Sequence, residues 1–205
     1  MAPGRIVILN GAPRSGKSSI ARAMQERLAG TWMNFGVDVV MAATPKQKLP
    51  GIGLRPGGEL PELEPFVRES YAALFASIAG HARQGLDVVS DLGLHDKYSR
   101  PLGILDTAVA ALAGLPVLFV GVTCPLDTVM ARRNADSRGG YYAAGETVPE
   151  PVRRWQEAVH VPGIYDLTID TEAVTPEAAA EKIGAMLAAP PRPTAFERLA
   201  RHSSH

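Results

Sequence analysis

The sequence contains very little cysteine: Cys124 is the only one among 205 residues. A single cysteine excludes an internal disulfide framework and a zinc site built from several cysteines, and it is typical of a reducing compartment, so we expect a cytoplasmic protein. An excess of charge is missing as well, because 21 basic and 21 acidic residues give a formal net charge of zero. Such a chain has no global field that attracts nucleic acid or an anionic membrane, and we expect neither partner.

Signals for export and membrane insertion are also missing. The first residues lead directly into a short apolar run without the basic and apolar regions of a signal peptide, so we expect none. Residues 107–126 carry no charge and are nominally long enough to span a bilayer. However, Gly114, Pro116 and Gly121 interrupt this stretch, and its second half is rich in β-branched residues. We therefore predict the end of a helix, a turn and a buried strand instead of a membrane span.

The length and composition indicate one globular domain. Domains average about 150 residues, and a chain with 46% hydrophobic and 20% charged residues is not disordered. Segments with the patterns of strands and helices alternate along it, which predicts a three-layer α/β fold with a parallel sheet between two layers of helices. The predicted strands are 5–10, 31–36, 86–90, 117–123 and 165–170, and the predicted helices are 18–28, 37–43, 66–83, 101–113, 125–134, 149–160 and 176–187.

Two segments interrupt this alternation. Residues 44–65 are rich in proline and glycine, which predicts a long loop, and loops of this length are usually functional or mobile. Residues 189–205 form a proline-rich tail after a domain that we place at 1–188. A short helix around 196–200 in this tail could either dock on the domain or remain free.

The strongest motif in the sequence is Gly-Ala-Pro-Arg-Ser-Gly-Lys-Ser at residues 11–18, which matches the Walker A pattern at every fixed position. Glycines let the backbone approach phosphate oxygens, and successive N–H groups form an anion-binding nest at a helix N-terminus. Lys17 can reach the β- and γ-phosphates of ATP, and the Ser18 hydroxyl can ligate Mg²⁺. The predicted ATP-binding residues are Gly11, Ala12, Pro13, Arg14, Ser15, Gly16, Lys17, Ser18 and Ser19.

Two alternatives apply to this loop. A glycine-rich turn between a strand and a helix can exist without any ligand. A dinucleotide-binding turn would have an acidic residue about twenty residues later, as Asp38 is here, but the required G-x-G-x-x-G spacing is absent. The pattern therefore favours a nucleoside triphosphate site.

Asp38 follows the second predicted strand, and strand ends at the carboxyl edge of a parallel sheet face the ligand crevice. A carboxylate there could take the proton of a substrate hydroxyl as it attacks the γ-phosphate. It could equally be the N-cap of the helix that begins at Val39, a common role for aspartate. Position alone does not separate these two interpretations.

Three segments together resemble the chloramphenicol phosphotransferase family. They are Ile-Leu-Asn-Gly at 8–11 with the following Gly-Lys-Ser, Trp-x-x-Phe-Gly-Val-Asp at 32–38, and Val-Leu-Phe-Val-Gly-Val-x-Cys at 117–124. The resemblance covers roughly residues 5–171 and implies a small P-loop kinase of the nucleoside-monophosphate-kinase type with strand order 2-3-1-4-5. It also implies that Asp38 is the general base and that ATP phosphorylates an antibiotic hydroxyl. Residues 44–65 and 93–98 depart from the family pattern, and both should border the acceptor pocket.

Asp91 and His95 are further candidates for the acceptor side. Asp91 ends an apolar strand, as an acid that holds Mg²⁺ through a water would, and it could also touch the acceptor. The alternative for Asp91 is a turn residue at the end of a strand. His95 could bind the acceptor or assist proton transfer, and its alternative is a solvated side chain in a polar loop.

Three arginines, Arg132, Arg133 and Arg138, flank a segment rich in glycine and tyrosine. Related P-loop kinases carry a lid there, which we place at 132–148, and its arginines neutralise charge on the transferred phosphoryl group. The alternative is that all three are solvated residues near a helix C-terminus. Trp155 lies at helical spacing from Val152 and Val159, which favours a core position over a stacking platform.

These observations predict a phosphotransferase that uses ATP and Mg²⁺ to phosphorylate a hydroxyl of a small molecule, such as chloramphenicol or a related metabolite. Asp38, Lys17 and the arginines would be catalytic, Asp38, Asp91 and His95 would face the acceptor, and Ser18 and Asp91 would hold the metal. The alternatives are a nucleotide-binding regulatory switch and a kinase of primary metabolism acting on a nucleoside or sugar acid. An apolar pocket lined by residues 44–65 would favour the antibiotic-like acceptor. The sequence predicts no oligomeric state.

Overall fold

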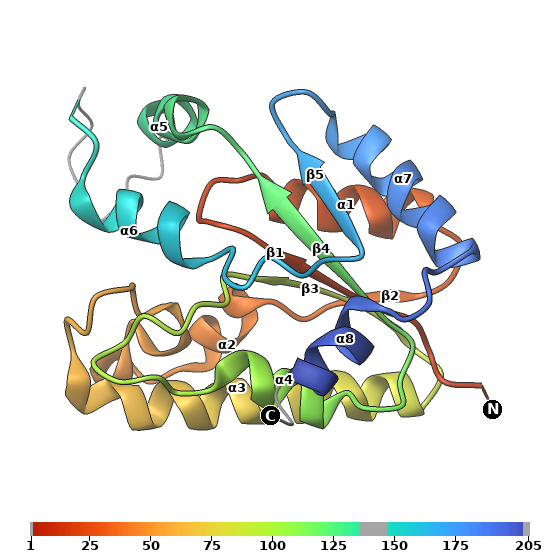
Figure 1. The fold of residues 1–205 in the computed structure, drawn as a ribbon, viewed down its shortest axis with the longest axis horizontal. Helices are drawn as coiled ribbons and strands as arrows, with labels where there is room; N and C mark the ends of the chain where they lie inside the picture. The colour runs from red at the N-terminus through yellow and green to blue at the C-terminus, as the bar shows by residue number, and fades with distance from the viewer. Residues whose placement is uncertain (1, 136–146, 203–205) are drawn as a thin grey trace.

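The computed structural model describes residues 2–135 and 147–202, which form a five-stranded sheet between two layers of helices (Figure 1). The strands are β1 (Ile6–Asn10), β2 (Trp32–Asn34), β3 (Asp87–Leu92), β4 (Val117–Thr123) and β5 (Leu167–Asp170). They lie in the order β2-β3-β1-β4-β5, and every neighbouring pair is parallel. The predicted fold class and strand order are therefore confirmed.

Continuous apolar runs place β1 and β4 at the centre of the molecule. All five side chains of β1 and six of the seven in β4 are buried, as expected for strands that are covered on both faces. The helices that surround the sheet are α1 (Lys17–Arg27), α2 (Val37–Ala43), α3 (Glu64–Arg83), α4 (Ile104–Ala111), α5 (Leu126–Ala135), α6 (Glu150–Ala158), α7 (Pro176–Ala188) and α8 (Ala195–His202).

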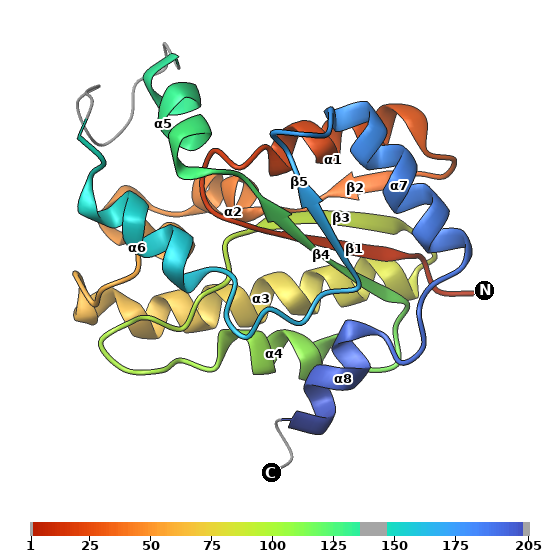
Figure 2. The ribbon, with the colours of Figure 1, turned by 45° about the horizontal axis from the view of Figure 1, so that its top comes forward.

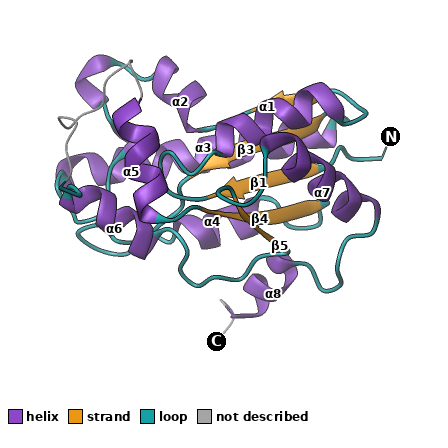
Figure 3. Ribbon diagram, turned by 90° about the horizontal axis from the view of Figure 1, so that it is seen from above, coloured by secondary structure: helices purple, strands orange, loops and turns teal. Residues whose placement is uncertain are grey.

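The helices divide into three groups around the sheet. Helices α1 and α7 cover one face, and α3, α4 and α8 cover the other (Figure 1). Helices α2, α5 and α6 lie beyond the ends toward which the strand arrows point (Figures 2 and 3). The carboxyl edge of the sheet, where parallel α/β proteins bind ligands, is therefore the edge that these three helices surround.

The segment 44–65 is more ordered than a long loop would be. It contains three short 3₁₀ turns, η1 (Lys46–Lys48), η2 (Gly51–Gly53) and η3 (Pro61–Leu63), and α3 begins at Glu64 instead of 66. Ile52 and Leu54 are fully buried in the core cluster that contains the apolar face of α3. Prolines and glycines set the turns here, while isolated apolar side chains anchor the segment, a combination that no helical or strand periodicity reveals.

Residues 107–126 contain the end of α4, a turn and the buried strand β4, as predicted. In the described parts of the chain, no helix is both long enough and apolar enough to cross a membrane.

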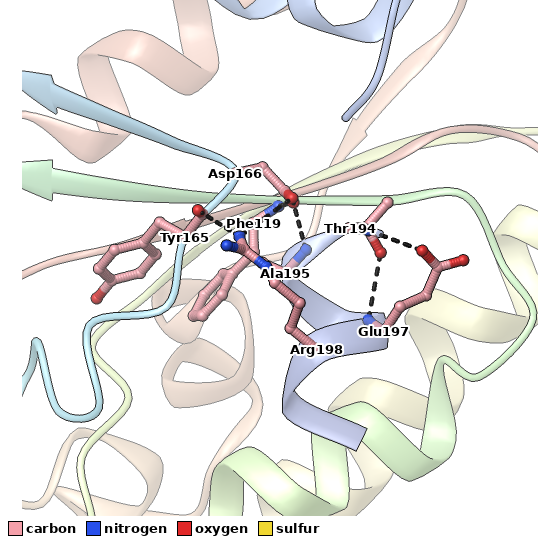
Figure 4. Close-up of polar contacts among 7 residues, drawn as sticks. All are labelled: Phe119, Tyr165, Asp166, Thr194, Ala195, Glu197 and Arg198. Atoms are coloured by element: carbon pink, nitrogen blue, oxygen red, sulfur yellow. Dashed lines mark hydrogen bonds and ion pairs between the residues drawn. The ribbon is translucent and has the colours of Figure 1, made fainter. Parts of the chain in front are cut away.

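The helix in the proline-rich tail docks on the domain. Phe196 of α8 packs edge-on against Phe119 of β4, with ring centroids 5.4 Å apart. The helix starts with a reciprocal pair of bonds: the Thr194 hydroxyl accepts from the Glu197 N–H, and the Glu197 carboxylate accepts from the Thr194 N–H at 2.7 Å (Figure 4). This capping box satisfies two N–H groups that the first turn leaves free.

Asp166 links this helix to the sheet. Its Oδ1 accepts from the Ala195 N–H at 2.5 Å, and its Oδ2 accepts from the Phe119 N–H at 2.8 Å (Figure 4). The Asp166 side chain has no exposed surface, and Ala195 and Phe119 are themselves buried. One buried carboxylate therefore satisfies two buried N–H groups on elements that are far apart in the sequence.

Asp166→Ala should destabilise the domain because it leaves both N–H groups without a partner. Each loss costs roughly 1–3 kcal/mol, so we expect the free energy of unfolding to fall by about 2–5 kcal/mol. Urea denaturation followed by circular dichroism measures this change. Asp166→Asn keeps one acceptor oxygen and should lose about half as much. Equal stability of Asp166→Ala and the unsubstituted protein would show that the two bonds do not hold α8.

Candidate active site

The loop between β1 and α1 curves tightly, and its glycines permit this shape. Gly16 has a φ of 96° and Arg14 a φ of 68°, both in the left-handed region. A Cβ added at Gly11 would lie 2.3 Å from the carbonyl oxygen of Val122, so no larger residue fits there without a shift. Lys17 is the first residue of α1. The motif thus has the predicted strand–loop–helix context.

The ammonium group of Lys17 lies within the curve of the loop. Its Nζ donates to the carbonyl oxygens of Gly11 and Ala12, both at 2.8 Å. Burial lowers the pKa of Lys17 to about 8, although the nearby charges of Asp91 and Asp38 partly oppose this effect. A cation that is partly removed from water in this way binds a phosphate group strongly.

Ser18 and Asp91 bring two oxygen ligands together. The Ser18 hydroxyl donates to Oδ2 of Asp91 at 2.6 Å, across from α1 to the end of β3. Burial raises the pKa of Asp91, while the bond from Ser18 and the charge of Lys17 act in the opposite direction. Residues 2–135 and 147–202 contain no cluster of three or more histidine, cysteine or acidic side chains placed to hold a metal. Two oxygen ligands fit Mg²⁺, which usually takes one or two protein carboxylates and keeps several waters.

Ser15 of the phosphate loop gives a further indication of a ligand. The hydroxyl of Ser15 is buried and has no hydrogen-bond partner within the described part of the chain. An unpartnered buried donor is costly unless a ligand supplies its partner, and phosphate oxygens would do so. The loop and the Ser18–Asp91 pair therefore fit a magnesium nucleotide.

Gly36 brings the second strand close to Asp91. A Cβ at Gly36 would lie 1.7 Å from Oδ1 of Asp91, so only glycine allows this approach. Gly36 is also the N-cap of α2, and Asp38 follows in the first turn of that helix. The interpretation of Asp38 as the N-cap is therefore wrong, because the cap position is two residues earlier. The carboxylate of Asp38 is exposed and belongs to the wall of a cavity.

This first cavity has a volume of about 620 Å³ and is the larger of the two that meet at the phosphate loop. Most of the predicted site residues line it. Lys17, Ser18, Asp38, Asp91 and Arg133 all line it. The phosphate loop adds Gly11, Ala12, Pro13 and Arg14 to its wall. The remaining lining residues are largely apolar: Val37, Met41, Pro50, Ile52, Gly53, Tyr71, Leu92, Gly93, Val129, Pro151, Val152 and Trp155, together with Arg55.

A second cavity, of about 380 Å³, shares Arg14, Lys17 and Ser18 with the first. Its other lining residues are Gly16, Ser19, Ile20, Arg132, Thr171, Val174 and Pro176. The phosphate loop therefore separates two cavities and contributes the same residues to both. Such an arrangement can bring two small molecules to one phosphoryl group.

The arginines predicted for the lid have different positions. Arg132 donates to the carbonyl oxygen of Thr171 at 2.7 Å and to its hydroxyl at 2.9 Å, and it lines the second cavity. Arg133, the next residue of α5, lines the first cavity. Arg138 and much of the predicted lid at 132–148 lie outside the described residues, so their roles stay predictions.

His95 is buried, and it lines neither of these two cavities. Its ring is buried, its Nε2 lies 3.2 Å from the carbonyl oxygen of Leu54, and it packs edge-on against Trp155 at 4.8 Å between centroids. Burial lowers the pKa of His95 to about 4, so the ring is neutral near pH 7. Trp155 lines the first cavity, and His95 lies between Trp155 and the backbone of Leu54. This placement does not support the predicted contact with an acceptor.

Sequence reasoning missed several apolar wall residues. Trp155 is a core residue as predicted, but it also lines the first cavity. Tyr71 of α3 lines it too, although its helical spacing is that of an ordinary core residue. Only the expectation that residues 44–65 border the acceptor pocket pointed to this wall, through Pro50, Ile52 and Gly53.

A five-stranded parallel sheet in this order, with a Walker A loop at its carboxyl edge, defines a P-loop kinase fold. The M. tuberculosis APS kinase CysC, solved with AMPPNP and APS, has this fold: TM-score 0.62, 17% identity, covering 92% of this chain and 100% of that one. Shikimate kinase from Acinetobacter baumannii, solved with shikimate, has it too: TM-score 0.59, 14% identity, covering 91% and 94%.

The sequence comparisons then define the family. Residues 4–188 match the family described as "Chloramphenicol phosphotransferase-like protein", and the chain belongs to this family. A relative from Mycobacterium tuberculosis named "Putative O-phosphotransferase Rv2636" is 28% identical over 213 residues, covering 97% of this chain and 89% of the relative. The resemblance inferred from the sequence is confirmed, and the protein has the fold and family of a phosphotransferase.

ATP binding should weaken as the pH rises through about 8, the pKa of Lys17. The neutral lysine loses its attraction for phosphate, so the Kd for ATP should rise by up to about tenfold per pH unit until the ammonium of the complex also titrates. Isothermal titration calorimetry measures this. Lys17→Ala should bind ATP weakly and without this pH dependence. A pH-independent affinity in the unsubstituted protein would contradict the role of Lys17.

The lowered pKa of Lys17 also makes the stability of the protein depend on pH. The pKa of Lys17 falls from 10.5 to about 8 on folding, so the unfolded chain binds more protons between these values. The free energy of unfolding of the unliganded protein should therefore contain a term that rises with pH in this window, and this term should be absent in Lys17→Ala.

Gly36→Ala should displace Asp91, because the added Cβ would lie 1.7 Å from its carboxylate oxygen. The gain in ATP affinity that Mg²⁺ provides should then fall by about tenfold, the usual effect of disturbing groups around a metal. Titrations of ATP with and without Mg²⁺ measure this gain. Gly80→Ala is the matched control, because a Cβ at Gly80 meets nothing within 4 Å. An unchanged Mg²⁺ dependence in Gly36→Ala would remove Asp91 from the metal site.

Proposed function

We propose that this protein transfers the γ-phosphoryl group of ATP to a hydroxyl group of a small, largely apolar alcohol, in the presence of Mg²⁺. The observation that carries the proposal is the pair of cavities that meet at the phosphate loop, with Asp38 in the wall of the larger one. The smaller cavity suits the nucleotide, since it adjoins the N-terminus of α1 and contains Arg132.

Each residue has a separate role in this proposal. Asp38 accepts the proton of the acceptor hydroxyl as its oxygen forms a bond to the γ-phosphorus and the bond from that phosphorus to ADP breaks. Lys17 and the backbone of the loop hold the phosphates, and Arg133 neutralises charge on the transferred group. Ser18 and Asp91 would hold Mg²⁺, which supplies neutralisation of charge on the β- and γ-oxygens when bound. The rate gain would come mainly from positioning and electrostatics.

The composition of the larger cavity supports an antibiotic-like acceptor, such as chloramphenicol or a related metabolite. Pro50, Ile52 and Gly53 from the segment 44–65 line it with aliphatic groups. Besides Lys17, three cations line it: Arg14 of the phosphate loop, Arg133 of α5, which acts on the phosphoryl group in this proposal, and Arg55, which forms an ion pair with Glu59 at 3.0 Å. A sugar acid or nucleotide acceptor would need cations on this wall in addition to those that serve the phosphates of ATP.

Asp38→Asn should reduce kcat by roughly 10²–10⁴-fold, the usual contribution of a general base, while the Kd for ATP stays nearly unchanged. An assay of ADP release over a panel of neutral hydroxylated compounds, with phosphorylated product identified by mass spectrometry, measures this effect. Calorimetry with ATP supplies the control. If Asp38→Asn keeps its turnover, the carboxylate is not the base.

The same panel of compounds distinguishes the proposed function from the two alternatives, a regulatory switch and a kinase of primary metabolism. Tight ATP binding without stimulation by any acceptor would favour a regulatory switch, in which the nucleotide only orders parts of the protein. Stimulation confined to nucleosides or sugar acids would favour a kinase of primary metabolism. Stimulation by neutral alcohols with an apolar body supports the proposal.

A further inference from the structure

Tyr71 stands out on the wall of the larger cavity. Its side chain is only 1% exposed and stacks on Phe75, with ring centroids 5.8 Å apart. It nevertheless lines the cavity, and no hydrogen bond of its hydroxyl is found in the part of the chain that the structure describes. A phenolic hydroxyl is both a donor and an acceptor, and buried polar groups normally have a partner.

Tyr98 provides an internal comparison. The Tyr98 hydroxyl is fully enclosed without a partner among the described residues, and the Tyr98 ring packs on His95 at 4.3 Å between centroids. Tyr98, however, does not line the larger cavity. The two tyrosines therefore share burial and the lack of a protein partner, and they differ in whether a bound molecule could supply one.

The hydroxyl of Tyr71 lies in a different electrostatic environment from the phosphate-binding end of the cavity. Burial raises the pKa of Tyr71 above its usual range, with no contribution from the charges of Lys17, Asp38 or Asp91. Lys17, in contrast, is affected by both carboxylates. The group therefore stays protonated at neutral pH and can donate a hydrogen bond.

We propose that the Tyr71 hydroxyl hydrogen-bonds a second polar group of the acceptor, distinct from the hydroxyl that is phosphorylated. The acceptor is then a neutral molecule with an apolar body, a reacting hydroxyl and at least one further hydroxyl, carbonyl or amide group. Tyr71 determines acceptor specificity, while Asp38 acts at the reacting hydroxyl. The inference rests on the proposed phosphotransferase function.

The test compares Tyr71→Phe with Tyr98→Phe in the ADP-release assay. Tyr71→Phe should raise the KM for the acceptor by about 5- to 10-fold, the worth of one neutral hydrogen bond, while the KM for ATP stays constant and kcat changes by less than about twofold. Tyr98→Phe should leave all three values unchanged. Because neither hydroxyl has a partner among the described residues, the melting temperature of both variants should equal or exceed that of the unsubstituted protein.

Acceptor pairs make the assignment specific. The panel should include alcohols and their analogues that lack one polar group away from the phosphorylated hydroxyl. The unsubstituted protein should discriminate against the analogue by about 5- to 10-fold in kcat/KM, and Tyr71→Phe should lose this discrimination. Loss of discrimination together with unchanged melting temperature separates binding of the acceptor from a structural effect.

Several results would overturn the assignment. Identical acceptor kinetics in Tyr71→Phe and the unsubstituted protein would show that the hydroxyl does not touch the acceptor, while the proposed function itself would stand. A lower melting temperature in Tyr71→Phe would assign the hydroxyl a structural role. If the unsubstituted protein phosphorylates no compound, the proposed function fails, and the assignment of Tyr71 fails with it.

Discussion

The position of the Asp91 carboxylate is the constraint on which the rest of the site depends. It accepts from Ser18 on one side and occupies the space next to Gly36 on the other, so it fixes both the start of α1 and the start of α2. Strand pairing makes this possible, because Asp91 lies beside Leu9 of β1, just before the phosphate loop. The parallel register of three strands thus brings the phosphate loop, Ser18, Asp91 and Asp38 to one edge of the sheet.

Much of the fold could be predicted because its local signals agree with one another. The buried strands are continuous apolar runs, the helices are periodic, and the Walker A motif lies between a strand and a helix. The strand order came from the family resemblance, since spacing alone does not define it. Residues 44–65 could not be predicted in the same way, because single buried side chains such as Ile52 and Leu54 anchor a backbone shaped by proline and glycine.

The candidate site also contains some residues that could be predicted from the sequence and others that could not. The phosphate-binding residues could be identified because their chemistry requires certain residue types at fixed spacing. The apolar wall of the larger cavity has no such requirement, and Tyr71 and Trp155 have the helical spacing of core residues, which hides their place on this wall. His95 illustrates the opposite case, since a polar residue in a polar segment is buried behind this wall through contacts with residues distant in sequence.

The residues that line the larger cavity differ in how well the domain should tolerate their substitution. Ile52 and Tyr71 contribute to the hydrophobic core, so a substitution that changes the size of either side chain alters stability as well as the shape of the cavity. Met41 and Val152 line the same cavity but are only half-buried. A search for variants with new substrate preferences should therefore begin at these two positions, where the domain can tolerate side chains of different volume.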